Sequence, residues 1–236
     1  MRNNTIVSFA DNKDVFRQTL KRLLESLDFV KFKGRIFPFT EYSDIQSPPH
    51  LGDGSIPYAF KSYAITKAIS KGAEVILWCD SSIYAVKDLS PIFDHIKREG
   101  YIFFDNVGFS IGEYTSDACL EQHGMSRDEA YNSKMIMACV MGFDIRNQKA
   151  IDFLTRYFEA STDGVSYQGA WNNDNLCVSK DKKCKGHRHD QSVASIIIKQ
   201  QGLTITNAQS TYLAYTSHQG VMPIATSVSL WANGQL

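Results

Sequence analysis

The sequence has no excess of charge of either sign and no long hydrophobic run. Lys and Arg together number 25, as do Asp and Glu, so the formal net charge is zero. Duplex DNA binding normally requires a basic excess that neutralises phosphates, so the composition argues against a nucleic-acid partner. The apolar stretch before Asp11 is far shorter than a signal-peptide core or a transmembrane helix. These absences favour a soluble, cytoplasmic protein with no transmembrane segment.

Cysteine is scarce and odd in number. The five cysteines, which mostly lie in apolar stretches, are Cys79, Cys119, Cys139, Cys177 and Cys184. This pattern favours free thiols in a reducing compartment over a disulfide framework. Cys177 and Cys184 could also form a zinc site with His187 and His189. Their spacing, C-x6-C-x2-H-x-H, matches no standard zinc finger, so the sequence gives zinc little support.

Periodicity indicates an α/β domain. Hydrophobic residues make up 43% of the 236 residues and charged residues 21%, enough for a sizeable core. Short apolar runs alternate with stretches of helical spacing, and no repeat or linker divides the chain. We expect a single domain over residues 1–236, in which helices cover a sheet.

The expected elements follow from these runs and from their flanking turn residues. Strands are predicted at about 5–10, 35–38, 74–79, 100–104, 135–143 and 211–215. Helices are predicted at about 15–27, 55–72, 91–98, 126–129, 147–158 and 190–201, the fourth of them opened by a capping box. The polar stretch 161–186 has no period, and a run of this length predicts a functional loop or lid.

Polar clusters follow three of the expected strands, at Ser8 to Asp11, Asp80 to Ser82, and Gly142 to Asp144. In open α/β sheets, ligands bind at the carboxyl ends of the strands. Asp80 follows a continuous apolar run, and a carboxylate flanked by two hydroxyls can hold a hard divalent cation. Asp and Ser are also the commonest cap and turn residues, so this cluster alone leaves both interpretations open.

A further polar cluster, His187 to Gln191, directly follows the long loop. Asp190 lies at the expected start of a helix, where a carboxylate complements the helix dipole. That role does not account for the two histidines and the arginine beside it.

Several segments, in their order along the chain, resemble the retaining GT-A glycosyltransferases, the branch that includes glycogenin and lipopolysaccharide galactosyltransferases. These segments are 58–64, 74–82, 88–93, His189-Asp190-Gln191-Ser192-Val193 and Tyr215-Thr216-Ser217-His218-Gln219-Gly220. In that family a hydrophobic strand ends in an Asp-x-Asp metal motif, an Asp-Gln segment follows, and a late His-x-Gly completes the metal shell. The sequence departs from the motif at Ser82, which stands in place of its second acid.

The resemblance implies a Rossmann-like GT-A fold with a mixed central sheet flanked by helices. It also implies a hexosyltransferase that moves sugar from a nucleoside-diphosphate sugar to a glycan or other hydroxyl acceptor, with retention. Mn²⁺ or Mg²⁺ would assist by neutralising charge on the leaving diphosphate. Asp80, Ser82 and His218 are the metal-ligand candidates that the resemblance gives, and Asp190 and Gln191 are the catalytic-site candidates. We expect Asp190 to position the sugar.

Other residues would hold the donor. The resemblance places Ser8, Ala10 and Asp11 against its base or ribose. Lys61 either contacts phosphate or is a solvated helix lysine. Gly142 would let the sugar approach the backbone closely. Trp171, on the long loop, would stack on an acceptor ring or simply anchor its loop.

Three alternative functions remain open. A sugar-nucleotide nucleotidyltransferase has a similar fold but needs a Gly-rich signature after the first strand, and residues 10–13 are not Gly-rich. A non-catalytic module that binds nucleotide sugars would need neither Asp80 nor His218. The basic tract from Lys180 to Arg188 would fit a base-modifying DNA glycosyltransferase.

Overall fold

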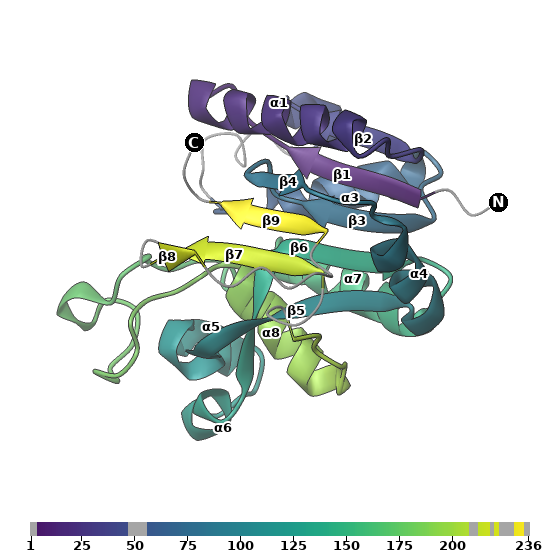
Figure 1. The fold of residues 1–236 in the computed structure, drawn as a ribbon. Helices are drawn as coiled ribbons and strands as arrows, with labels where there is room; N and C mark the ends of the chain where they lie inside the picture. Colours follow the sequence, from purple (N-terminus) through teal and green to yellow (C-terminus); the bar gives the residue numbers. More distant parts are fainter. Residues whose placement is uncertain (1–3, 47–55, 208–211, 218–219, 222–228, 234–236) are drawn as a thin grey trace.

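A mixed five-stranded sheet, in the order β2-β1-β3-β6-β5, forms the centre of the computed structural model (Figure 1). The structure describes residues 4–46, 56–207, 212–217, 220–221 and 229–233. The strands of this sheet are β1 (Asn4–Phe9), β2 (Arg35–Phe39), β3 (Val75–Cys79), β5 (Tyr101–Ser110) and β6 (Lys134–Asp144). β1, β2 and β3 are parallel, whereas β6 runs antiparallel to both β3 and β5.

Helices cover both faces of the sheet (Figure 1). One face packs against α3 (Phe60–Ser70), α7 (Gln148–Ala160) and α8 (Asp190–Gln201). The other face packs against α1 (Asp14–Phe29) and α4 (Ser90–Glu99). Every residue of β3 is buried, because this strand has packed layers on both sides.

A second, four-stranded sheet shares the face that carries α1 and α4. Its strands, in the order β4-β9-β7-β8, are β4 (Ile83–Ala85), β7 (Leu213–Ser217), β8 (Gly220–Val221) and β9 (Leu230–Asn233). The sequence pattern indicates only the strand at 211–215, because the other strands have two to four residues and show no clear period.

Short elements complete the fold. They are the 3₁₀ helices η1 (Tyr42–Ile45), η2 (Ile111–Tyr114) and η3 (Asp174–Leu176), and the helices α5 (Asp117–Gln122) and α6 (Arg127–Tyr131). The Ser126 side chain caps α6 by accepting a hydrogen bond from the Glu129 N–H, as the sequence predicts. Within 161–186, only η3 is regular.

The predicted α/β fold is confirmed, with two differences in local structure. The helix predicted from residue 55 begins only at Phe60, because Tyr58 has a left-handed φ of 63° that a helix cannot include. β5 extends six residues past the predicted end, through an exposed bulge around Gly108. No helix in the described part of the chain is both long and apolar enough to cross a membrane.

Candidate active site

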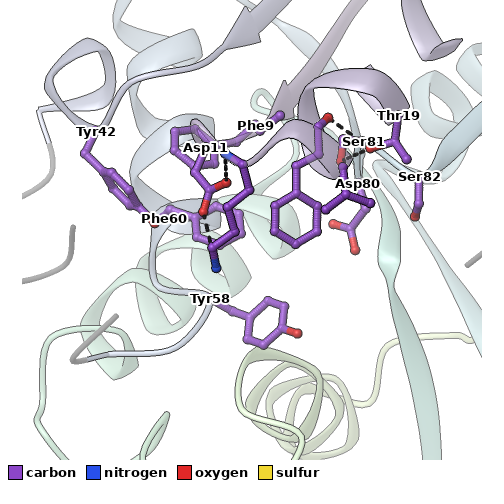
Figure 2. Close-up of a pocket in the computed structure, with 13 residues that line it drawn as sticks. Phe9, Asp11, Thr19, Tyr42, Tyr58, Phe60, Asp80, Ser81 and Ser82 are labelled. Atoms are coloured by element: carbon purple, nitrogen blue, oxygen red, sulfur yellow. Dashed lines mark hydrogen bonds and ion pairs between the residues drawn. The ribbon is translucent and has the colours of Figure 1, made fainter. Parts of the chain in front are cut away.

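The carboxyl ends of β1 and β3 form one wall of a cavity of about 450 Å³. Because the two strands are parallel and adjacent, the residues that follow them meet at one edge of the sheet. Ala10 and Asp11 follow β1, and Asp80 and Ser82 follow β3, and all four line this cavity. Figure 2 shows Tyr42, Phe9 and Phe60 on one side of it and Asp80 with Ser82 on the other. The sequence therefore predicts four of the residues around this cavity.

Aromatic side chains make one side of the cavity apolar. The ring of Phe9 lies 4.8 Å from Phe60 and 5.0 Å from Tyr42, measured between centroids. Asp11 adds a polar group at the entrance, where its Oδ1 accepts a hydrogen bond from the Lys13 backbone N–H. An apolar wall beside a few polar groups suits a flat heterocycle attached to a polar sugar.

A second cavity, of about 210 Å³, meets the first at Tyr58 and Asp80, which line both. Its other lining residues are Lys61, Asn106, Met137, Ala138, Cys139, Trp171, Arg188, Asp190 and Gln191. The two predicted catalytic-site residues, Asp190 and Gln191, are thus adjacent to the predicted metal ligand Asp80. α8 and β3 bring them together from segments more than one hundred residues apart.

Lys61 connects the two acidic residues. Its Nζ lies 2.8 Å from Asp190 Oδ2 and 3.0 Å from Asp80 Oδ1, and it donates to the Ala138 carbonyl at 3.1 Å. The Lys61 side chain is only 3% exposed. The interpretation as a solvated helix lysine is therefore wrong. All three N–H donors of the ammonium group have protein acceptors, and the predicted phosphate contact stays a prediction.

Burial and neighbouring charges shift the pKa of Lys61, and also that of Asp190, in opposite directions; we call Lys61, Asp80 and Asp190 the triad. Burial alone lowers the pKa of Lys61, but the Asp190 and Asp80 carboxylates outweigh it, so this pKa lies above its usual value. Burial raises the pKa of Asp190, and the ion pair with Lys61 offsets only part of that rise. We therefore treat Lys61 as charged and Asp190 as a weaker acid than an exposed aspartate.

One carboxylate oxygen of Asp80 has no hydrogen-bond partner among the described residues. Its Oδ1 accepts hydrogen bonds from Trp78 Nε1 at 2.8 Å and from Lys61, whereas no described residue donates to Oδ2. Trp78 and Asp80 are two positions apart, so they lie on the same side of the extended chain. The Asp80 side chain is 28% exposed, which leaves Oδ2 accessible from the cavities.

The described residues fit a divalent metal only in part. Asp80 Oδ2 and the Ser82 hydroxyl are oxygen donors of the kind that Mg²⁺ and Mn²⁺ prefer, while His218 lies outside the described residues. Over the described ranges, no three His, Cys, Asp or Glu side chains gather in one place. A metal here would fit the mode in which a carboxylate, substrate phosphates and water share the ion.

Two predicted donor contacts are wrong. Ser8 is fully buried and lines neither cavity. Gly142 pairs with Leu77 in the middle of β3, so it lies inside the sheet and not at the edge that forms the cavities. A Cβ at Gly142 would lie 2.4 Å from Ile96 Cδ1 and 2.7 Å from Ile102 Cγ2. The glycine therefore makes room for core packing and not for a sugar.

The long loop is held by hydrogen bonds that its composition did not indicate. The Asn173 amide donates to the Ser179 and Cys184 carbonyls, and its Oδ1 accepts from the Val178 and Ser179 N–H groups. Asn173 thus bonds to backbone groups on both sides of the loop and adds to the burial of Tyr167, Val178 and Cys184.

The two histidines before Asp190 have structural contacts. Nδ1 of the buried His187 accepts from the Ser116 N–H at 3.2 Å, and Nε2 donates to the Ser166 carbonyl at 3.0 Å. Burial lowers the pKa of His187 to about 3. His189 stacks on Tyr58 with centroids 5.5 Å apart.

The proposed zinc set has no support in this arrangement. The thiol of Cys184 contacts the Thr115 and Gly186 carbonyls, and Cys177 is exposed on the loop near the Asn172 carbonyl. The imidazole of His187 is fully engaged with backbone groups, as described above.

His189 also has an unusual backbone conformation. Its φ of 48° and ψ of −116° lie in a region that only glycine adopts without strain. The residue ends the loop and directly precedes the first residue of α8, Asp190. The strained turn therefore helps to fix where the Asp190 carboxylate enters the cavity.

Some cavity residues escape sequence reasoning. Asn106 lies on the β5 bulge, and Arg188 lies between the rings of Tyr114 and Trp171. No periodic pattern identifies them, because their roles depend on how the bulge and the loop pack together. Trp171 itself is 50% exposed and lines the smaller cavity, so the predicted acceptor contact stays a prediction.

Comparison with known proteins identifies the fold. No protein-family profile matches the chain, and no curated protein sequence matches it. A structure of a glycosyltransferase involved in the glycosylation of the major capsid of PBCV-1 covers 99% of this chain and 95% of its own, with a TM-score of 0.60 and 13% identity. The fold is that of the GT-A glycosyltransferases. Apo mouse xyloside xylosyltransferase 1 matches over 99% of this chain and 98% of its own, with a TM-score of 0.57 and 8% identity.

Proposed function

We propose that the protein is a glycosyltransferase that moves a hexosyl group from a nucleoside-diphosphate sugar to a hydroxyl acceptor, such as a glycan or polysaccharide. We also propose that it retains the anomeric configuration and uses a divalent metal. One observation carries this proposal: the two cavities meet at Asp80, and Lys61 bridges Asp80 to Asp190 at that junction. The glycosyltransferase fold is consistent with it.

Each of the two cavities would hold a different part of the donor. The larger one, with its aromatic side and Asp11, suits the nucleoside. The smaller one, with Asp190 and Gln191, suits the sugar. The diphosphate that connects them would then lie beside Asp80, where the free Oδ2 is accessible.

A metal would be held by Asp80 Oδ2 and the Ser82 hydroxyl, with His218 as the third ligand that the family resemblance implies. When bound, it would neutralise negative charge on the departing diphosphate. Because Lys61 already pairs with Asp80 Oδ1, we expect metal affinity to be low until a diphosphate adds its own oxygens.

The chain's own residues position the reactants. Lys61 holds both carboxylates at fixed distances, so Asp80 and Asp190 remain close despite their like charge. Asp190, which is 5% exposed, keeps one face towards the cavity and can accept hydrogen bonds from sugar hydroxyls. The centroid of the Tyr58 ring lies 5.4 Å from the Lys61 ammonium nitrogen, and Tyr58 lines both cavities beside it.

The direct test is Asp80→Asn, assayed as nucleotide release and sugar transfer from a panel of UDP- and GDP-sugars with Mn²⁺. The amide oxygen can still accept from Trp78 and Lys61, so the fold should persist while the metal-facing charge is lost. We expect transfer to fall at least about 100-fold, the upper range for loss of a metal-site partner.

Asp94→Asn is the matched control, because Asp94 is a 69% exposed carboxylate on α4. Transfer by Asp80→Asn equal to that of the parent at saturating Mn²⁺ would refute the proposed role. Binding of nucleotide sugars without nucleotide release under any condition would instead indicate a non-catalytic binding module.

A further inference from the structure

The guanidinium of Arg188 is clamped at the wall of the smaller cavity. Its Cζ lies 4.4 Å from the centroid of the Tyr114 ring and 3.9 Å from that of the Trp171 ring. One N–H of the guanidinium donates to the Trp171 carbonyl. Stacking between two rings fixes the plane of a guanidinium, so its remaining N–H donors have a set direction.

This cation lacks an acidic partner in the described part of the chain. The two carboxylates that line the same cavity, Asp80 and Asp190, pair with Lys61 instead. Four other arginines, Arg17, Arg98, Arg127 and Arg146, do pair with acidic side chains. Burial lowers the pKa of Arg188, although the guanidinium stays charged. A half-buried charge without a counter-ion is costly, which makes an anionic ligand favourable at this wall.

Neutral hydrogen-bonding groups lie beside it. The side-chain amides of Asn106 and Gln191 line the same cavity, and neither bonds to another described residue. Amides of this kind can donate to and accept from sugar hydroxyls. The cavity, at about 210 Å³, is smaller than the usual ligand pocket of about 300–1,000 Å³ and suits a single sugar ring.

We propose that Arg188 makes the smaller cavity a site for an acidic sugar, whose carboxylate pairs with the guanidinium while its hydroxyls bond to Asn106 and Gln191. The planar fork of arginine matches a carboxylate with paired hydrogen bonds. The acidic ring is either the sugar of the donor or that of the acceptor. The donor case rests on the proposed function, whereas a free acidic sugar would bind without it.

Titration calorimetry with Mn²⁺ tests the donor case. The ligands are UDP, UDP-glucose and UDP-glucuronate, with GDP, GDP-mannose and GDP-mannuronate in parallel. A charge-assisted hydrogen bond contributes roughly 1.5–3 kcal/mol, so the acidic nucleotide sugar should bind about 10- to 100-fold more tightly than the neutral one. Ligand-detected NMR with free glucuronate and glucose, at saturating diphosphate, tests the acceptor case.

Arg188→Gln should remove the preference for the acidic sugar, and Arg188→Lys should keep part of it. Lys185→Gln is the matched control, because Lys185 is a nearby exposed cation that pairs with Glu113 at 2.7 Å and does not line the cavity. This control should keep the full preference. Thermal unfolding shows whether each variant is folded. If a variant does not fold, the affinities of the wild-type protein for the acidic and the neutral sugar still test the proposal.

The outcomes separate this inference from the proposed function. Equal affinity of the wild-type protein for acidic and neutral sugars in both assays would overturn the inference and leave the glycosyltransferase proposal standing. Equal weakening of UDP and UDP-glucuronate by Arg188→Gln would also overturn it, since Arg188 would then contact phosphate. Binding of free glucuronate without binding of any nucleotide would support the inference and refute the proposed function.

Discussion

Replacing Lys61 by methionine removes the cation that pairs with both the Asp80 and the Asp190 carboxylates. Lys61 is 3% exposed, Asp190 5% and Asp80 28%. Breaking a buried ion pair from one side costs about 3–5 kcal/mol, because the other charge stays buried without compensation. A domain is stable by roughly 5–15 kcal/mol in total, so Lys61→Met should lose a large part of its stability.

Most of this loss should come from Asp190. Asp80 is partly exposed, so water can hydrate its carboxylate when Lys61 is absent, and Asp80 contributes little to the loss of stability. Asp190 would keep only the Tyr157 hydroxyl, at 3.4 Å, as a side-chain partner. The double variant Lys61→Met/Asp190→Asn removes both charges and should recover at least about 2 kcal/mol of the loss. Lys67→Met, on the same helix, is the control for loss of a lysine charge.

The loss should depend on pH. Without Lys61, the folded pKa of Asp190 rises further above that of the unfolded chain. A carboxyl group with a raised folded pKa adds stability below its unfolded pKa of about 3.9 and loses it as the pH rises through the folded value. The difference in free energy of unfolding between the parent and Lys61→Met should therefore become smaller towards pH 4. Urea unfolding followed by circular dichroism at pH 4 to 8 measures this. A loss in free energy of unfolding below about 1 kcal/mol, or a loss that is the same at every pH, would refute the claim that Lys61 compensates the buried charge of Asp190.

Three further predictions concern neighbouring positions. Below its unfolded pKa of about 6.5, protonation of His187 favours the unfolded chain, so stability should fall by up to about 1.4 kcal/mol per pH unit; His187→Gln should show a shallower fall in urea midpoints. His189→Gly should unfold at higher temperature than His189→Ala, reversing the usual order, because only glycine adopts φ 48° and ψ −116° without strain; the opposite order would contradict the strain. Gly142→Ala should lower the free energy of unfolding by about 1–3 kcal/mol through overpacking but leave KM for the donor unchanged. A raised KM would show that Gly142 contacts the donor.

Sequence reasoning works well where a pattern is local. The continuous run before Asp80 correctly predicts a strand buried on both faces, and the helical spacing after Asp190 correctly predicts α8. Because the carboxyl ends of parallel strands share one edge of a sheet, Asp11 and Asp80 could be placed together from their positions after strands. The same rule fails for Gly142, since an apolar run does not reveal whether a strand is parallel or antiparallel.

The sequence by itself determined the α/β class, the order of the main elements, and the carboxylates Asp80 and Asp190 as candidates, because hydrophobic period and strand ends are local properties. Only the tertiary structure decided what Lys61 and Arg188 do. On the sequence both are ordinary basic residues near helices. In the fold, burial removes water from Lys61 and leaves two carboxylates as its partners, whereas Arg188 is held between two rings and pairs with no acid among the described residues. The role of a charge depends on which groups remain near it once water is excluded, and that is a property of packing across the whole chain.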